Sequence, residues 1–157
     1  MNRDAVSIEI TPERPDTAAA SELIAELQDH LGAQYPPESQ HGYTVDKLIR
    51  EGVAFFVIRC DGAPAGCGGI QLVGSDYGEL KRMYVRPAFR GLGLGKRLVD
   101  HLAAHARANG LRLLRLETGI HQREAIGLYE RMGFVPIGPF GPYTDDPLSV
   151  FFERPLP

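Results

Sequence analysis

Apolar and polar residues along the chain repeat with the two periods that distinguish helices from strands. Leu94, Leu98 and Leu102 recur every four residues, which places them on one face of an α-helix that Gly110 would end. Residues 7–11 alternate between polar and apolar, as expected of a half-buried strand. The same reasoning predicts helices over about 17–31, 45–50, 94–109 and 121–132, and strands over 7–11, 53–59, 65–73, 79–85, 111–118, 134–137 and 148–153.

The order of these elements predicts the fold class. Three consecutive strands form a meander, and a strand–helix–strand–helix–strand series follows it. Such an order requires a mixed sheet with helices on both faces. We therefore expect an α/β (α+β) fold with a mixed, mostly antiparallel sheet of six to seven strands and four flanking helices. No internal repeat or linker divides the 157 residues, so we expect residues 1–157 to form a single domain.

Composition excludes several classes of protein. Apolar residues make up 43% and charged residues 24% of the chain, as in soluble globular proteins. No apolar run reaches the roughly 20 residues of a membrane span, and the first residues lack the core of a signal peptide, so we expect a cytoplasmic protein without a membrane partner. A net charge of −3 argues against nucleic acid. Cys60 and Cys67 are expected to be reduced, buried thiols, and no metal-ligand spacing is present.

A glycine-dense loop at residues 90–95 precedes the predicted helix that starts near residue 94. Gly91, Gly93 and Gly95 let the backbone approach a ligand closely. A helix N-terminus has unpaired N–H groups and a partial positive charge, so this loop suits an anion. Residues 80–99 contain no acidic residue. The basic residues in this range are Lys81, Arg82, Arg86, Arg90, Lys96 and Arg97.

Two common phosphate-binding motifs do not fit this loop. A P-loop requires glycine where Arg90 stands and Ser or Thr where Arg97 stands. A dinucleotide fingerprint starting at Gly91 requires glycine where Lys96 stands. The pattern that fits is Arg/Gln-x-x-Gly-x-Gly/Ala, with Arg90, Gly93 and Gly95 in the specified positions.

In its strand–loop–helix setting this pattern resembles the acyl-CoA signature of the GNAT superfamily of N-acetyltransferases. A second segment, residues 125–134, resembles the superfamily's A-x-x-L-Y-x-x-x-G-F motif. The resemblance covers essentially the whole chain. It implies an acyl-CoA N-acyltransferase-like fold and transfer of an acetyl group from acetyl-CoA to a primary amine by direct attack on the thioester.

The resemblance also implies which residues hold acetyl-CoA. Backbone groups of the strand before the loop would bind the pantetheine arm, and N–H groups of the loop would bind the diphosphate. His121 stands where many members have asparagine, so it is either a proton relay or an ordinary loop histidine. The expected cofactor-binding residues are Met83, Tyr84, Val85, Arg90, Gly91, Leu92, Gly93, Leu94, Gly95, Lys96, Arg97, His121 and Tyr129.

Amine acetylation requires a base for the amine and an acid for the departing thiolate. By resemblance, Tyr129 is the expected general acid. Glu79 is the expected general base, because a glutamate at this distance from the loop activates the amine in some members. Glu117, at the end of the next strand, is the rival, and some members have no single base.

The resemblance further implies that the acceptor lies between segments 34–43 and 140–146, and both segments carry aromatic and polar side chains. The expected acceptor-binding residues are Tyr35, Glu38, Tyr43, Glu79 and Tyr143. These proline-stiffened segments suit a small amine better than a protein surface. A protein or peptide acceptor, a non-catalytic acyl-CoA sensor and a nucleic-acid-binding module remain alternatives, and the chain could be a monomer or a homodimer.

Overall fold

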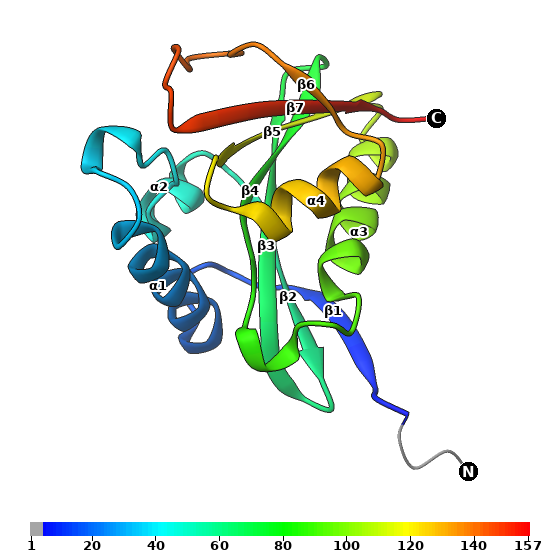
Figure 1. Ribbon diagram of the computed structural model, residues 1–157. Helices are drawn as coiled ribbons and strands as arrows, with labels where there is room; N and C mark the ends of the chain where they lie inside the picture. Colours follow the sequence, from blue (N-terminus) through cyan, green and yellow to red (C-terminus); the bar gives the residue numbers. More distant parts are fainter. Residues whose placement is uncertain (1–4) are drawn as a thin grey trace.

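The computed structural model describes residues 5–157, and it contains the predicted mixed sheet flanked by four helices (Figure 1). The helices are α1 (Ala18–Gly32), α2 (Val45–Arg50), α3 (Leu94–Ala108) and α4 (Arg123–Arg131), with short 3-10 turns at Pro37–Ser39 and Pro87–Phe89. The strands are β1 (Ile8–Pro12), β2 (Ala54–Cys60), β3 (Ala63–Val73), β4 (Tyr77–Val85), β5 (Leu113–Gly119), β6 (Val135–Ile137) and β7 (Ser149–Pro155). The prediction of the fold class is confirmed.

The seven strands form one sheet in the order β1-β2-β3-β4-β5-β7-β6. All neighbouring strands are antiparallel except β4 and β5, which are parallel. The chain runs from β4 through α3 to β5, because a parallel neighbour needs a crossover. The parallel pair therefore joins the N-terminal meander to the C-terminal half of the sheet.

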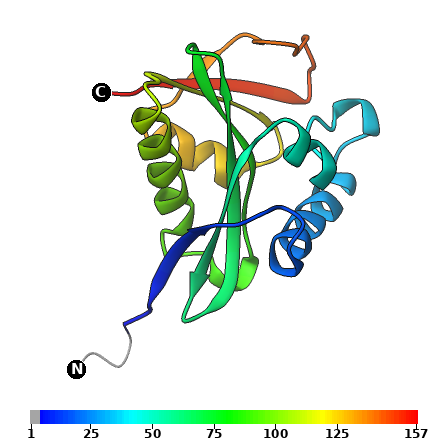
Figure 2. The ribbon, with the colours of Figure 1, turned by 180° about the vertical axis from the view of Figure 1, so that it is seen from behind.

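Helices cover both faces of the sheet. In Figures 1 and 2, α1 and α2 lie on one side of the strands, and α3 and α4 lie on the other. Successive residues of β2 enter different cores: Phe55 packs with the α1 cluster, and Phe56 packs with the α3 cluster. Burial on both faces explains why residues 53–58 are continuously apolar. Within residues 5–157, no helix is both long and apolar enough to span a bilayer.

The cysteines lie inside these cores. Cys60 and Cys67 are both free and buried, as the sequence predicts. Burial raises the pKa of Cys67 to about 12. Its thiol is therefore protonated at neutral pH and packs as a small apolar group.

Strand β4 is irregular at the centre of the sheet. Cys67 pairs with Tyr84 and Gly69 pairs with Lys81, so two residues of β4 lie opposite Gly68 of β3. Arg82, inside this bulge, has a positive φ of 53°. Strands β4 and β5 pair only at Gly78–Leu114 and Glu79–Arg115. Beyond these pairs the two strands separate, and the site described below occupies the opening.

Candidate active site

A groove of about 840 Å³ runs from the opening between β4 and β5 along the start of α3. One side of the groove is the end of β4 and the glycine-rich loop, and the other side is α4 together with the two residues before it. Leu27, His30 and Gln34 of the α1 region border it as well. The volume of the groove is large enough to hold a ligand of drug size or larger.

The N-terminus of α3 opens into this groove without a side-chain cap. Helix α1 is capped by Thr17, whose side chain accepts a hydrogen bond from the N–H of Ala20, and α2 is capped by Thr44 in the same way. Helix α3 instead has Gly93 as its N-cap residue, which has no side chain to cap it, and the first turn of α3 contains no acidic residue. Its first N–H groups therefore remain available to an external acceptor, and a negatively charged one is favoured by the helix dipole.

Two glycines shape the loop before α3. Gly91 has φ 86° and Gly93 has φ 75°, in the left-handed region that other residues avoid. A Cβ atom at either position would meet open space, so these glycines are required by backbone conformation and not by crowding. Two basic side chains beside the loop pair with acids at the surface: Arg90 with Glu124 at 3.7 Å and Lys96 with Asp100 at 3.1 Å.

A second, smaller cavity of about 120 Å³ lies on the other side of the opening. Its walls come from α1, from segment 39–42, from the middle of β4 and from the end of β5. It shares with the large groove the residues Leu27, Met83, Gln122, Ala125 and Tyr129. The two cavities therefore meet where β4 and β5 separate.

Tyr129 stands at this meeting point. Its ring is buried, with 4% of the residue exposed, and packs edge-on against Phe134 with ring centroids 5.5 Å apart. Its hydroxyl makes no hydrogen bond with the described part of the chain, and Tyr129 lines both cavities. Burial raises the pKa of Tyr129 above the ordinary value, so the phenol stays protonated at neutral pH. It can donate a proton to a group in either cavity.

Glu117 is the carboxyl group that lines the small cavity. Burial raises its pKa, and the hydroxyl of Ser149 donates a hydrogen bond to its Oε2 at 2.7 Å. A raised pKa brings a carboxylate closer to the proton affinity that a base needs at neutral pH.

Glu79 lies in a separate polar cluster and lines neither cavity. It is 4% exposed, pairs with the ammonium of Lys81 at 2.7 Å and accepts a hydrogen bond from the hydroxyl of Tyr143 at 2.5 Å. Lys81 also sits over the ring of Tyr43, 3.9 Å from its centroid. Both contacts of the carboxylate are made by Oε2 of Glu79, and Lys81 also donates a hydrogen bond to the Tyr143 hydroxyl at 3.1 Å, so the three side chains form one internal cluster.

Tyr35 closes the small cavity toward α4. Its hydroxyl donates to Oε1 of Gln122 at 3.1 Å and accepts from the N–H of His121 at 3.0 Å. These contacts join segments 86 or more residues apart. A Cβ atom at Gly119 would overlap the Tyr35 hydroxyl, so glycine at this position makes room for the bridge.

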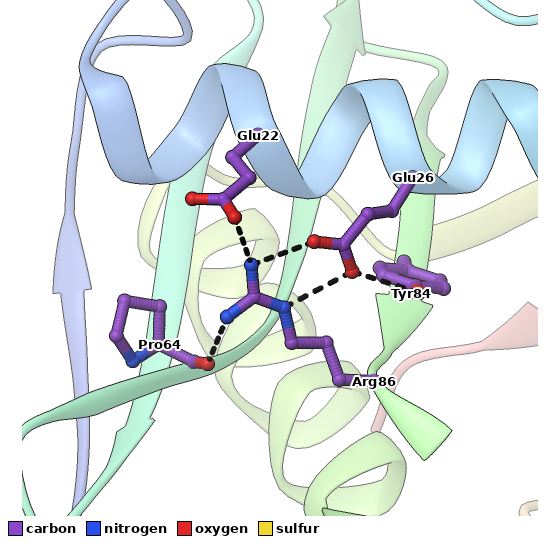
Figure 3. A network of polar contacts seen from close by, with 5 residues as sticks. All are labelled: Glu22, Glu26, Pro64, Tyr84 and Arg86. Carbon is purple, nitrogen blue, oxygen red and sulfur yellow. Dashed lines mark hydrogen bonds and ion pairs between the residues drawn. The ribbon is translucent and has the colours of Figure 1, made fainter. Parts of the chain in front are cut away.

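Arg86 fixes α1 against the end of β4, the strand that borders the groove (Figure 3). Its guanidinium donates to Glu26 at 3.0 and 2.7 Å and to the carbonyl of Pro64 at 3.0 Å. Glu22 lies 3.2 Å away, and the hydroxyl of Tyr84 also donates to Glu26. This network holds the wall of the groove in place from the side of α1.

Residues 21–134 match the model of the Acetyltransferase (GNAT) family. The chain belongs to this family. An IAA acetyltransferase of Azospirillum brasilense is 44% identical over 151 residues, covering 96% of this chain and 99% of that protein. A crystal structure from Klebsiella pneumoniae, classed as an acyl-CoA N-acyltransferase, has a TM-score of 0.80 at 40% identity and covers 95% of this chain and 97% of its own. The resemblance inferred from the two motifs is confirmed, and the protein is an N-acetyltransferase.

A more distant structure shares only the fold. The PaiA N-acetyltransferase of Thermoplasma acidophilum, crystallised with coenzyme A, has a TM-score of 0.75 at 20% identity, covering 95% of this chain and 99% of that one.

The structure of this acetyltransferase brings most of the expected cofactor residues into one groove. Those that line it are Met83, Tyr84, Val85, Arg90, Gly91, Gly93, Leu94, Gly95, Lys96, His121 and Tyr129. Leu92 and Arg97 lie outside the lining, and both are exposed. The roles of all these residues stay predictions.

The expected acceptor residues are more scattered. Tyr35 lines the small cavity, whereas Glu38 is exposed and outside it. Tyr43, Glu79 and Tyr143 belong to the cluster around Lys81.

Arg82 and Gln122 are not among the residues predicted from the sequence for the site, yet both line the small cavity. His41 lines it too, and it lies in segment 34–43, which was expected at the acceptor although His41 was not singled out there. His41 reaches Asp146 at 3.3 Å and so joins the two segments expected around the acceptor. One signal was available for Arg82. The sheet was expected to be covered on both sides, so a charged residue in the middle of β4, such as Lys81 or Arg82, has to be buried on either face.

Proposed function

We propose that this protein transfers an acetyl group from acetyl-CoA to a primary amine of a small molecule by direct attack of the amine on the thioester, and that residues 1–157 act as one acetyltransferase domain. The observation that carries the proposal is the meeting of a long groove and a small cavity at Tyr129. The groove suits a long, anionic donor, and the cavity suits a compact acceptor.

The groove fits coenzyme A in shape and in chemistry. The uncapped N–H groups at the start of α3 and the open loop at Gly91 and Gly93 match a diphosphate. The end of β4, unpaired on its β5 side, offers backbone groups to an amide-containing arm. Arg90 and Lys96 can exchange their surface acids for phosphate oxygens. Acetyl-CoA, when bound, would supply the acetyl thioester. The coenzyme A complex of the Thermoplasma protein supports this choice of ligand.

The residues at the meeting point divide the proton transfers between them. An alkylammonium group must lose a proton before its nitrogen can attack. We assign that proton to Glu117, directly or through a water molecule, because Glu117 lines the acceptor cavity. Tyr129 donates its phenolic proton to the departing sulfur, because Tyr129 lines the groove and its hydroxyl has no other partner in the described chain. Glu79 stays the alternative base, acting through Tyr143 from the neighbouring cluster.

The small size of the acceptor cavity supports a small-molecule amine. Tyr35 closes one end through its bonds to Gln122 and His121, which leaves little room for a folded protein surface. A protein N-terminus is the second candidate acceptor. A purely acyl-CoA-binding role is disfavoured by Tyr129 and Glu117, which have no need to face the cavities in a sensor.

The test is thiol release from acetyl-CoA in the presence of a panel of small amines and of peptides with free N-termini. We expect turnover with small amines and weak or no turnover with peptides. Peptide turnover alone would move the function to protein acetylation. Binding of acetyl-CoA without turnover of any acceptor would contradict catalysis.

A further inference from the structure

Arg82 is a buried cation in the wall of the small cavity, and all of its partners are neutral. Only 8% of the residue is exposed. Its Nε donates to the carbonyl of Tyr43 at 2.8 Å, and its Nη2 donates to Oε1 of Gln28 at 2.8 Å. Its Nη1 has no hydrogen-bond partner within residues 5–157 and lies against Gly42, another residue of the cavity wall. A guanidinium group stays charged in proteins, so this charge needs compensation.

Two other basic residues of this strand region, unlike Arg82, have acidic partners. Arg86 is more exposed, yet it is surrounded by Glu22 and Glu26 (Figure 3). Lys81, adjacent to Arg82 in sequence, pairs with Glu79 at 2.7 Å. Burial lowers the pKa of Arg82, which reflects the loss of hydration without an acidic neighbour.

The surroundings hold Arg82 in place for a ligand. Gln28 donates through Nε2 to Gln40 at 2.6 Å, and Gln40 donates to the carbonyl of Tyr35 at 2.8 Å. A Cβ atom at Gly42 would overlap the guanidinium, so glycine there leaves room for it. The guanidinium is thus fixed on two sides, with Nη1 and the second N–H of Nη2 left free. Two neighbouring N–H groups of this kind form the fork that carboxylates fit.

We propose that the acceptor carries a carboxylate near its amine, as an amino acid does, and that Arg82 binds this carboxylate. The proposal rests on the proposed function and specifies its acceptor. Arg82 and Glu117 line the same cavity from β4 and from β5, so a compact zwitterion can place its carboxylate at one and its amine at the other. A single ligand carboxylate balances the single unpaired cation, whereas a phosphate dianion beside Glu117 would leave excess negative charge.

The test compares free α-amino acids with their own carboxamides, which keep the amine and the side chain. We expect wild-type kcat/KM to favour the acids. Arg82→Gln should reduce the ratio of acid to amide by about 10- to 100-fold, the loss of one charged hydrogen-bond pair. Arg82→Lys should keep part of the preference, because it keeps the charge without the fork. The acid and the amide differ in the basicity of their amines, but this difference is the same for the wild type and the variant. It therefore cancels when the ratio of kcat/KM for acid and amide is compared between the two proteins.

Controls separate binding from folding. Arg107→Gln removes one exposed cation of α3 and should leave the ratio unchanged. Coenzyme A should raise the melting temperature of Arg82→Gln as it does in the wild type. Gln28→Glu supplies an internal carboxylate beside Nη2 and should also weaken the preference.

Calorimetric titration of the same acids and amides into the protein with coenzyme A decides the inference even without turnover. No turnover of any acceptor, together with tighter binding of acids that Arg82→Gln abolishes, would refute the proposed activity and keep the carboxylate site. Equal handling of acids and amides by the wild type would overturn the carboxylate site. A loss in Arg82→Gln that is the same for acids and amides would reduce Arg82 to a structural link between Gln28 and Tyr43.

Discussion

Replacing Tyr129 with phenylalanine separates a catalytic role from a structural one. The ring stays in place against Phe134, since only the hydroxyl is removed. That hydroxyl has no hydrogen-bond partner in the described chain, so no internal bond is lost. We therefore expect the free energy of unfolding to stay constant or to rise by up to about 1 kcal/mol, because a buried hydroxyl without a partner carries a desolvation cost. For a protein of this size that corresponds to a melting temperature raised by no more than about 4 °C.

The expected effect on catalysis is much larger. Loss of general-acid assistance lowers rates by about 100-fold or more, equivalent to about 2.7 kcal/mol in the barrier. The assay is single-turnover acetyl transfer with both substrates saturating, so that slow product release cannot hide the chemical step. Because burial raises the pKa of Tyr129, the wild type should keep its acid form up to at least pH 9.

A matched control is Tyr77→Phe. Tyr77 is also buried and packs edge-on against Phe140 at 5.5 Å, but it lines neither cavity. Its rate should stay close to that of the wild type. An unchanged single-turnover rate in Tyr129→Phe would refute the acid role, and equal rate losses in the two variants would show that the effect comes from packing.

Three further predictions address the base, the bridge over the cavity and the wall of the groove. Burial raises the pKa of Glu117 in the folded protein, so the free energy of unfolding falls as the pH rises above about 4.5, the ordinary pKa of this carboxyl group. Glu117→Gln should therefore raise the melting temperature at pH 8 and remove the acidic limb of the kcat/KM profile. An unchanged pH profile would return the base role to Glu79. Gly119→Ala forces Tyr35 from its site and should lower the free energy of unfolding by about 1–3 kcal/mol in urea titration while raising KM. A variant as stable as the wild type would contradict a stabilising role for the contacts of Tyr35 with Gln122 and His121. Hydrogen bonds from Arg86 hold the pKa of Glu26 below its ordinary value, so this ion pair stabilises the fold above about pH 4.5, and the stabilisation is lost as the pH falls through the lower pKa of the folded protein. Glu26→Gln should flatten the fall in melting temperature below pH 4.5. An unaltered fall would show that other carboxylates cause the loss of stability in acid.

The glycine-rich loop and the helix after it could be predicted because their determinants are local. Helix α3 follows from leucines every four residues, and the loop follows from glycines that need a positive φ. Strands and helices were recognised in the correct order for the same reason, since each has its own period or cap. The two Thr caps of α1 and α2 are examples.

The acceptor cavity could not be predicted in the same way, because non-local contacts form it. Whether Glu79 or Glu117 faces the cavity depends on the face of the sheet toward which each residue points. A strand that is buried on both faces has no alternation of apolar and polar residues, so its sequence does not indicate which residues point to which face. Glu79 thus entered a cluster with Lys81 and Tyr143 while Glu117 reached the cavity. The bulge that turns Arg82 toward α1 also depends on the register between β3 and β4, which no short segment encodes.

The most direct test of the central claim is a crystal structure of the protein with coenzyme A. The account predicts that the diphosphate accepts hydrogen bonds from N–H groups of residues 91–96 at the start of α3. It also predicts that the arm passes along Met83–Val85 and that the sulfur lies within hydrogen-bond reach of the Tyr129 hydroxyl. A diphosphate bound away from this loop, or a sulfur directed away from Tyr129, would contradict it.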